Sequence, residues 1–279
     1  MTKILKIEQL SEQIYRFRLA APRIAKRRKA GQFIILRITE DGERIPLTIA
    51  HADAEGGWIE IIVQAVGTST KILATKEVGD TIPDLVGPLG MPTHIEKFGK
   101  VLCIGGGVGV APLFPITEAL KEAGNHVTSI IGARSKDIMI LEDDMRLVSD
   151  VLHIASDDGS IGTKGFVTDI FHTLIEQGEH FDFAVVVGPP IMMKFTTAET
   201  INEGIHTVAS LNPIMVDGTG MCGGCRVSVD NQPKFACVDG PEFDASLVDW
   251  DGLLNRLSGY GKIAEKNQAH TCKIGLDHA

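Results

Sequence analysis

Apolar and polar residues alternate along the first third of the chain, most clearly over residues 14–19, 32–38 and 58–63. A period of two is typical of strands that bury one face, and glycine, proline and aspartate separate these runs as turn residues do. Short strands joined by turns favour a β-barrel or a β-sandwich. We therefore expect an antiparallel β-barrel over residues 1–97, with one short helix from Thr70 to Thr75.

The pattern changes over residues 98–208, where the apolar residues form continuous runs. Val101–Ile104 and Ala184–Val187 are typical of strands that are buried on both faces. They alternate with helical segments such as Pro112–Ala123, which Gly124 is expected to end. Strands that alternate with helices predict a Rossmann-like domain, in which helices cover both faces of a parallel sheet.

Residues 209–279 are rich in glycine and cysteine at first and then take a helical pattern. The apolar positions of one helix stripe are Trp250, Leu253, Leu254 and Leu257. Two interpretations of this stripe are open, because it can pack on the chain's own domains or dock on another subunit. We expect a small C-terminal module that ends in a helix.

The composition is that of a soluble globular protein, with 44% hydrophobic and 23% charged residues among 279. No apolar run approaches the roughly 18 residues of a membrane-spanning helix, and the N-terminus lacks a secretory pattern, so we expect a cytoplasmic protein that binds no membrane. A net charge of −9 argues against nucleic acid as a partner. The basic run from Arg23 to Lys29 is either a solvated loop or a docking patch for an acidic redox partner.

A glycine-rich turn spans Gly105 to Pro112, between a predicted strand and a predicted helix. Glycines let the backbone approach a phosphate closely, and the N-terminus of a helix presents free N–H groups to it. The context of strand, turn and helix favours nucleotide binding. The turn lacks the lysine of a Walker-type triphosphatase.

Three of the five cysteines lie close together, in the spacing Asp217-x4-Cys222-x2-Cys225-x11-Cys237. Two cysteines separated by two residues reach one metal from a tight turn, and the spacing resembles a plant-type 2Fe–2S pattern with Asp217 in the first position. Other interpretations are a structural zinc site and a redox-active cysteine pair without metal. Asp217 is either the fourth ligand or a turn residue. Of the other two cysteines, Cys103 is expected in the core, and Cys272 has no assigned role.

Together these motifs resemble the ferredoxin–NADP⁺ reductase-like flavoproteins, in the branch with a C-terminal 2Fe–2S module. The resemblance implies an FAD site in the barrel, with Thr48 as the catalytic hydroxyl near the reactive flavin nitrogen. It also implies that Leu47 packs on the flavin ring and that an arginine, here Arg44, holds the pyrophosphate. The residues expected at FAD are Arg44, Pro46, Leu47, Thr48, Gly67, Thr68, Ser69 and Thr70.

The same resemblance implies an NAD(H) site in the second domain. Gly188, Pro189 and Met192 match an element near the nicotinamide, although Val187 stands where a cysteine usually precedes it. The other residues expected at the nucleotide are Gly105, Gly106, Gly107, Gly109, Ala111, Pro112 and Asp157. Arg134 follows the second strand of this domain and is either a 2′-phosphate ligand or an exposed turn residue. Family analogy favours NAD(H).

The branch contains electron-transfer subunits of two kinds of complex. Asp217 favours the small subunit of an electron-bifurcating NADH-dependent ferredoxin:NADP⁺ oxidoreductase over the electron-transfer subunit of dihydroorotate dehydrogenase. Either implies a larger flavin or iron–sulfur partner subunit, with ferredoxin reached through the complex in the first. The cofactors would carry the redox chemistry and the protein would orient them. A different hypothesis is a non-enzymatic redox sensor with a zinc-stabilised tail.

Overall fold

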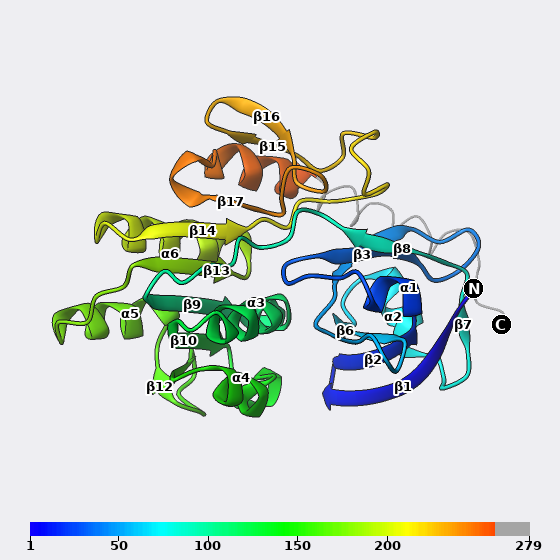
Figure 1. Ribbon diagram of the computed structural model, residues 1–279, viewed down its shortest axis with the longest axis horizontal. Helices are drawn as coiled ribbons and strands as arrows, with labels where there is room; N and C mark the ends of the chain where they lie inside the picture. The colour runs from blue at the N-terminus through cyan, green and yellow to red at the C-terminus, as the bar shows by residue number, and fades with distance from the viewer. Residues whose placement is uncertain (260–279) are drawn as a thin grey trace.

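The computed structural model describes residues 1–259, in three parts that follow one another along the chain (Figure 1). The first part holds two antiparallel sheets. One has the strand order β5-β6-β2-β1-β7, and the other has the order β4-β3-β8. Their bounds are β1 (Thr2–Ser11), β2 (Ile14–Ala20), β3 (Phe33–Arg37), β4 (Arg44–Thr48), β5 (His51–Asp53), β6 (Trp58–Gln64), β7 (Thr81–Ile82) and β8 (Asp84–Leu89).

The two sheets enclose one apolar core, as expected of a barrel. Phe17 of β2, Ile34 and Leu36 of β3, and Ile59 and Ile61 of β6 are all fully buried in it. These buried positions alternate with outward-facing residues, which explains the period of two in the sequence. Two short helices, α1 (Pro22–Ala25) and α2 (Thr68–Ala74), accompany the sheets. The expected helix of residues 70–75 is α2, and it begins two residues earlier.

The second part is built on a sheet with the strand order β12-β11-β10-β9-β13-β14-β17. All neighbours from β12 to β14 are parallel, and β17 pairs with β14 in the antiparallel sense. The bounds are β9 (Lys100–Gly106), β10 (His126–Ala133), β11 (Val151–Ser156), β12 (Thr163–Lys164), β13 (Phe183–Val187), β14 (His206–Ser210) and β17 (Glu242–Asp244). The predicted parallel sheet is confirmed.

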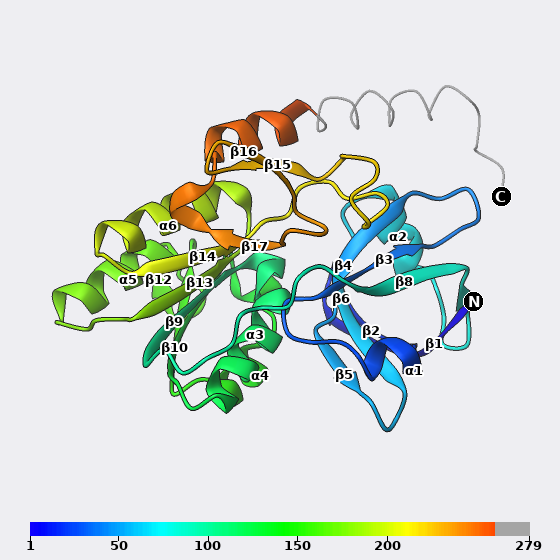
Figure 2. The ribbon, with the colours of Figure 1, turned by 45° about the horizontal axis from the view of Figure 1, so that its top comes forward.

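Helices cover both faces of this sheet (Figure 2). Leu113 and Ile116 of α3 and Met145 of α4 pack in the core on one face, whereas Phe171 of α5 and Met193 of α6 pack on the other. The helices are α3 (Val110–Glu122), α4 (Glu142–Val148), α5 (Val167–Glu176) and α6 (Pro190–Asn202), with short 3-10 turns at Gly107–Gly109 and Lys136–Ile138.

Helix α3 begins two residues before the expected start at Pro112. The N–H groups of a first helical turn have no partner within the helix, so a proline there costs no hydrogen bond. The helix ends one residue before the expected end at Ala123, and Gly124 terminates it as expected with a φ of +84°, a conformation that glycine adopts readily. Cys103 is fully buried in β9, as expected of a core cysteine.

The third part lies on the edge of the nucleotide sheet, since its strand β17 pairs with β14. A hairpin of β15 (Arg226–Val229) and β16 (Gln232–Phe235) turns at Asp230 and Asn231, and a 3-10 turn covers Ala245–Leu247. Residues 250–259 are helical. Leu253 of this helix is buried, and Trp250 and Leu257 pack beside it on the core of the nucleotide sheet. Three of the four stripe residues therefore pack on the chain's own domain.

The basic run is mostly exposed, but Arg28 faces the acidic residues Glu118 and Glu122 of α3. Burial lowers the pKa of Arg28, and these two carboxylates oppose the shift. This arginine therefore belongs to the contact between the barrel and the nucleotide domain. Within residues 1–259, no helix is long and apolar enough to cross a membrane. Cys272 lies outside the described residues.

Candidate functional site

A cavity of about 980 Å³ lies between the barrel and the nucleotide domain, and the third part closes one side of it. It brings together most of the residues expected at FAD and NAD(H). From those sets the lining includes Pro46, Leu47, Thr48, Thr70, Gly106, Gly107, Gly109, Ala111, Pro112, Arg134, Asp157, Gly188, Pro189 and Met192. Residues far apart in the sequence thus meet in one space large enough for a nucleotide cofactor.

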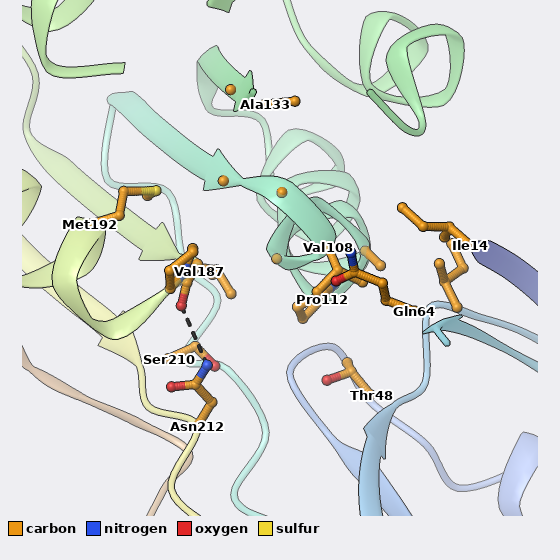
Figure 3. A pocket seen from close by; sticks show the side chains of 18 of the residues that line it. Ile14, Thr48, Gln64, Val108, Pro112, Ala133, Val187, Met192, Ser210 and Asn212 are labelled. Carbon is orange, nitrogen blue, oxygen red and sulfur yellow. Dashed lines mark hydrogen bonds between the residues drawn. The ribbon is translucent and has the colours of Figure 1, made fainter. Parts of the chain in front are cut away.

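Strand β4 brings its C-terminal residues Pro46, Leu47 and Thr48 to the cavity. Thr48 pairs with Phe33 of β3, which also lines the cavity. Figure 3 shows the Thr48 side chain on the barrel side and Asn212 on the opposite side. A hydroxyl beside apolar side chains suits the edge of a flat aromatic ring, as the flavin prediction requires.

The structure does not bring Arg44 to this cavity. Its Nε donates to the carbonyl of Val216 at 2.9 Å, and its Nη1 is hydrogen-bonded to the Asp84 carboxylate. Neither Arg44 nor either of these partners is among the residues that line the cavity. The guanidinium is therefore already engaged with the third part of the chain.

The polar side chains at the start of α2 also form hydrogen bonds within the protein. The Thr70 hydroxyl accepts from the backbone N–H groups of Val66 and Gly67, and Ser69 donates to Glu43 at 3.1 Å. Of the four residues expected here, only Thr70 lines the cavity, and Thr68 is exposed. Gly67 caps the helix in an extended conformation. Their phosphate-binding role stays a prediction.

The glycine turn meets the late Gly188 loop at very short range. A Cβ on Gly109 would lie 2.7 Å from the Gly188 Cα, and one on Gly106 would overlap the Met192 sulfur. Gly105 is packed against Leu113 and does not line the cavity. Gly107 differs from these glycines because its φ is +56° and no atom would lie within 4 Å of its Cβ. This open, left-handed position in front of α3 fits the close approach of a pyrophosphate.

The third part of the chain contacts the loop that begins at Gly188. Asn212 donates from Nδ2 to the Gly188 carbonyl at 3.4 Å (Figure 3). Val187 stands at the end of β13 where the family motif has a cysteine, and it is buried. The cavity continues past Arg134 and Asp157, which are both exposed at the ends of β10 and β11. A nucleotide over Gly107 would extend along these strand ends.

The cysteine module places two of its three sulfurs together. The Cys225 and Cys237 Sγ atoms lie 3.2 Å apart, and both side chains are buried. Cys222 is exposed on the loop before them, and its sulfur accepts from the backbone N–H of Gly224 at 3.4 Å. Within residues 1–259, no three Cys, His, Asp or Glu side chains are arranged as a metal site.

Burial sets the protonation state of Cys237 in this cysteine pair. Burial, followed by the neighbouring Cys225, raises the pKa of Cys237 to about 12. A thiol in such surroundings stays protonated unless a bound metal replaces its proton. Gly220 and Gly223 have positive φ angles of 85° and 67°, which give the loop a tight path around the sulfurs. The Cys225 and Cys237 pair therefore fits a shared metal group, and the assignment of all three cysteines to an iron–sulfur cluster stays a prediction.

Asp217 closes the loop through its carboxylate. It accepts from the Thr219 N–H at 2.9 Å and from the Cys222 N–H at 2.7 Å. These bonds, the one from Thr219 first, lower the pKa of Asp217. Asp217 therefore acts as a turn residue, as aspartate commonly does. Its role as a ligand stays a prediction.

The residues at these sites that the sequence alone missed include Phe33, Asn212 and Arg256. Phe33 and Asn212 line the cavity, and Arg256 donates to the cysteine loop. None of them lies in a motif. Phe33 had one available signal, since it is the first residue of the apolar run that forms β3.

Comparisons with known protein families divide the chain in the same order. Residues 1–94 match an oxidoreductase FAD-binding domain, and residues 103–198 match an oxidoreductase NAD-binding domain. Residues 212–249 match the iron–sulfur cluster binding domain of dihydroorotate dehydrogenase B. The chain thus carries FAD-binding, NAD-binding and iron–sulfur domains.

Several relatives match most of the chain, and two of them illustrate the spread of identity. A Thermotoga maritima protein described as an electron transfer subunit homolog of dihydroorotate dehydrogenase B (NAD⁺) is 51% identical over 260 residues, which cover 93% of this chain and 92% of that protein. The electron transfer subunit of dihydroorotate dehydrogenase B from Geobacillus sp. (strain WCH70) is 32% identical, over 88% of this chain and 96% of that protein.

A solved structure is also similar over nearly the full length. A chain of the NADH-dependent reduced ferredoxin–NADP oxidoreductase, studied for flavin-based electron bifurcation, superposes with a TM-score of 0.90 at 47% identity. The match covers 96% of this chain and 98% of that chain. The chain is therefore an oxidoreductase subunit that belongs to the family of flavin and iron–sulfur electron-transfer subunits represented by dihydroorotate dehydrogenase B.

Proposed function

We propose that this chain is the small electron-transfer subunit of an electron-bifurcating NADH-dependent ferredoxin:NADP⁺ oxidoreductase. The observation that carries the proposal is the likeness to such a complex, at 47% identity and a TM-score of 0.90 over 96% of the chain. Asp217 in the first position of the cysteine pattern adds support, because the resemblance links that residue to this kind of subunit.

The chain's own residues have separate tasks in this proposal. Gly106, Gly107 and Gly109 would receive the nucleotide pyrophosphate, while Gly188, Pro189 and Met192 would face the nicotinamide. Thr48 would place its hydroxyl at the reactive edge of the flavin ring, on which Leu47 packs. When bound, FAD supplies hydride acceptance and the 2Fe–2S cluster supplies one-electron transfer.

Three assignments complete the proposal. The FAD domain covers residues 1–97, the nucleotide domain residues 98–208, and the cluster module begins at residue 209. Cys222, Cys225 and Cys237 hold the cluster with Asp217 as the fourth ligand. The partner is a larger flavin or iron–sulfur subunit, which gives access to ferredoxin.

Anaerobic purification of the native complex tests the proposal. Flavin absorbance with about two irons and two sulfides per chain, together with NADH-dependent reduction of NADP⁺ that requires reduced ferredoxin, is the expected result. Zinc near one per chain without a flavin band would exclude it and would favour a zinc-stabilised sensor.

A second candidate is the electron-transfer subunit of an NAD⁺-linked dihydroorotate dehydrogenase. The 51% identity to the Thermotoga maritima homolog favours it. Assays on the same purified complex decide between the two candidates, because only a dihydroorotate dehydrogenase would reduce NAD⁺ with dihydroorotate. The substitution Asp217→Cys tests the ligand set, since an unchanged paramagnetic resonance spectrum and cluster potential would show that Asp217 is not a ligand.

A further inference from the structure

Two arginines from different parts of the chain hold the cysteine loop, which we define as residues 216–225. Arg44 comes from β4 of the flavin barrel and bonds to the first residue of the loop. Arg256 comes from the C-terminal helix and bonds to the turn between Cys222 and Cys225. Both contacts go to backbone carbonyls, so they fix the path of the loop rather than the position of one side chain.

Arg44 holds the side of the loop that lies on the barrel. Its Nε donates to the Val216 carbonyl at 2.9 Å, and Val216 directly precedes Asp217. The Asp84 carboxylate accepts from Nη1 of the same guanidinium and fixes its orientation. Next to this contact the loop lies flat on the barrel, since a Cβ on Gly218 would be 2.6 Å from Leu89 and 2.9 Å from Ile35.

Arg256 holds the opposite side. Its Nη2 donates to the carbonyls of Gly223 at 3.3 Å and Gly224 at 3.1 Å. These are the two residues between Cys222 and Cys225, so the guanidinium lies directly behind the turn that carries two of the proposed ligands. The helix that bears Arg256 is anchored by the buried Leu253.

The two arginines differ in where they meet the loop. Arg256 bonds to the turn between two of the proposed ligands, whereas Arg44 bonds to Val216 at the start of the loop and forms an ion pair with Asp84. Reduction of a cluster adds one negative charge, and a cation close to the cluster stabilises that form. Arg256 should therefore act mainly on the potential, and Arg44 mainly on the position of the loop.

We propose that Arg44 and Arg256 are positioning residues for the iron–sulfur site, which clamp the cysteine loop between the flavin barrel and the C-terminal helix. This inference rests on the proposed function only for the identity of the metal group. It gives Arg44 a role at the cluster module instead of at the flavin pyrophosphate, and it makes the flavin strand β4 one wall of the cluster site.

The test uses the full chain purified under argon, with a potentiometric titration followed by paramagnetic resonance and with iron release to a chelator. Arg256→Met should lower the midpoint potential of the cluster, and Arg256→Lys should restore much of it because it keeps the charge. Arg44→Met should release iron several-fold faster and broaden the resonance lines, because the loop is no longer fixed to the barrel.

Arg37→Met is the matched control. Arg37 is the cross-strand partner of Arg44 and forms ion pairs with Asp84 and Glu40, but its hydrogen bond goes to the Glu40 carbonyl and not to the loop. It should match the wild type in both measurements. Wild-type potential and iron release in both Arg44→Met and Arg256→Met would overturn the clamp. If the wild-type chain holds zinc instead of iron, the proposed function is overturned. The rates of zinc release from the same variants would then test whether the two arginines clamp the loop.

Discussion

At the scale of single residues, Gly107 leaves open space in the turn where we propose that a nucleotide phosphate binds. Gly107 and Gly178 both have positive φ angles, 56° and 86°, and a Cβ added to either would have no atom within 4 Å. An alanine at either site costs about 1 kcal/mol in backbone strain. Only Gly107 lines the cavity, whereas Gly178 follows α5 on the surface.

We predict that Gly107→Ala raises the KM for NADH at least tenfold, because the new methyl group occupies the space in front of α3. Gly178→Ala should show the same loss of thermal stability with an unchanged KM. Steady-state kinetics and calorimetry on the two variants measure both effects. Equal KM values for the two variants would mean that the nucleotide does not approach Gly107.

Glu242 is the residue whose ionisation should affect stability near neutral pH. It lies on β17 at the junction of the three parts, and Thr93 Oγ1 donates to its carboxylate at 2.5 Å. Burial raises the pKa of Glu242 from 4.5 to about 7, against the effect of the Thr93 bond. The unfolded chain therefore loses this proton at lower pH than the folded chain does.

Stability from this group is consequently present below about pH 4.5 and is lost as the pH rises through about 7. We predict that Glu242→Gln removes this decline, so its Tm exceeds that of the wild type by more at pH 8 than at pH 5. Thermal unfolding at the two pH values measures the difference. A constant difference in Tm would show that Glu242 titrates normally.

The elements follow the sequence pattern closely, because each depends on local periodicity. The strands with alternating residues and the buried strands β9 and β13 are where the pattern predicts them, and α3 begins two residues early and ends one residue early. The contacts of Arg44 could not be predicted in this way. Its partner Val216 lies 172 residues away, so the bond depends on how the third part folds back on the barrel. For the same reason, no local pattern identifies Arg256 as a partner of Gly223.

At the scale of elements, the packing of the helix of residues 250–259 can be tested. Leu253 is 3% exposed and belongs to the core of the nucleotide sheet, whereas the neighbouring Leu254 is only partly buried and does not belong to that core. We predict that Leu253→Ala destabilises the chain by about 2–5 kcal/mol, the usual cost of removing a buried leucine.

Leu254→Ala is the control and should cost much less. Denaturant unfolding of both variants gives the free energies directly. Because the helix also carries Arg256, Leu253→Ala should in addition speed iron release, whereas Leu254→Ala should not. Similar losses of stability in the two variants would mean that the helix does not pack through Leu253.

At the scale of the whole molecule, polar contacts join the parts of the chain around the shared cavity. Arg16 of β2 donates to Asp144 of α4 at 2.8 Å, and Thr93 bonds to Glu242. An ion pair with both partners partly exposed contributes only about 0–1 kcal/mol. Apolar packing also joins the parts, since Ile14 and Ile62 of the barrel share a buried cluster with Val110 of the nucleotide domain. A ligand in the cavity would add to this cohesion.

FAD should supply part of that cohesion, since four of the eight residues expected to contact it line the cavity between the barrel and the other two parts, namely Pro46, Leu47, Thr48 and Thr70. A ligand that binds only the folded state at one hundred times its Kd stabilises it by about 2.7 kcal/mol. We predict that the flavin-stripped chain unfolds at a lower temperature and that FAD at this excess restores the Tm. Calorimetry with and without FAD measures the shift, and quenching of flavin fluorescence supplies the Kd.

Riboflavin is the control, because it has the ring without the phosphates and the adenosine and should restore less. A Tm that does not respond to saturating FAD would mean that the folded chain does not bind FAD, and the assignments of Thr48 and Leu47 would fail with it.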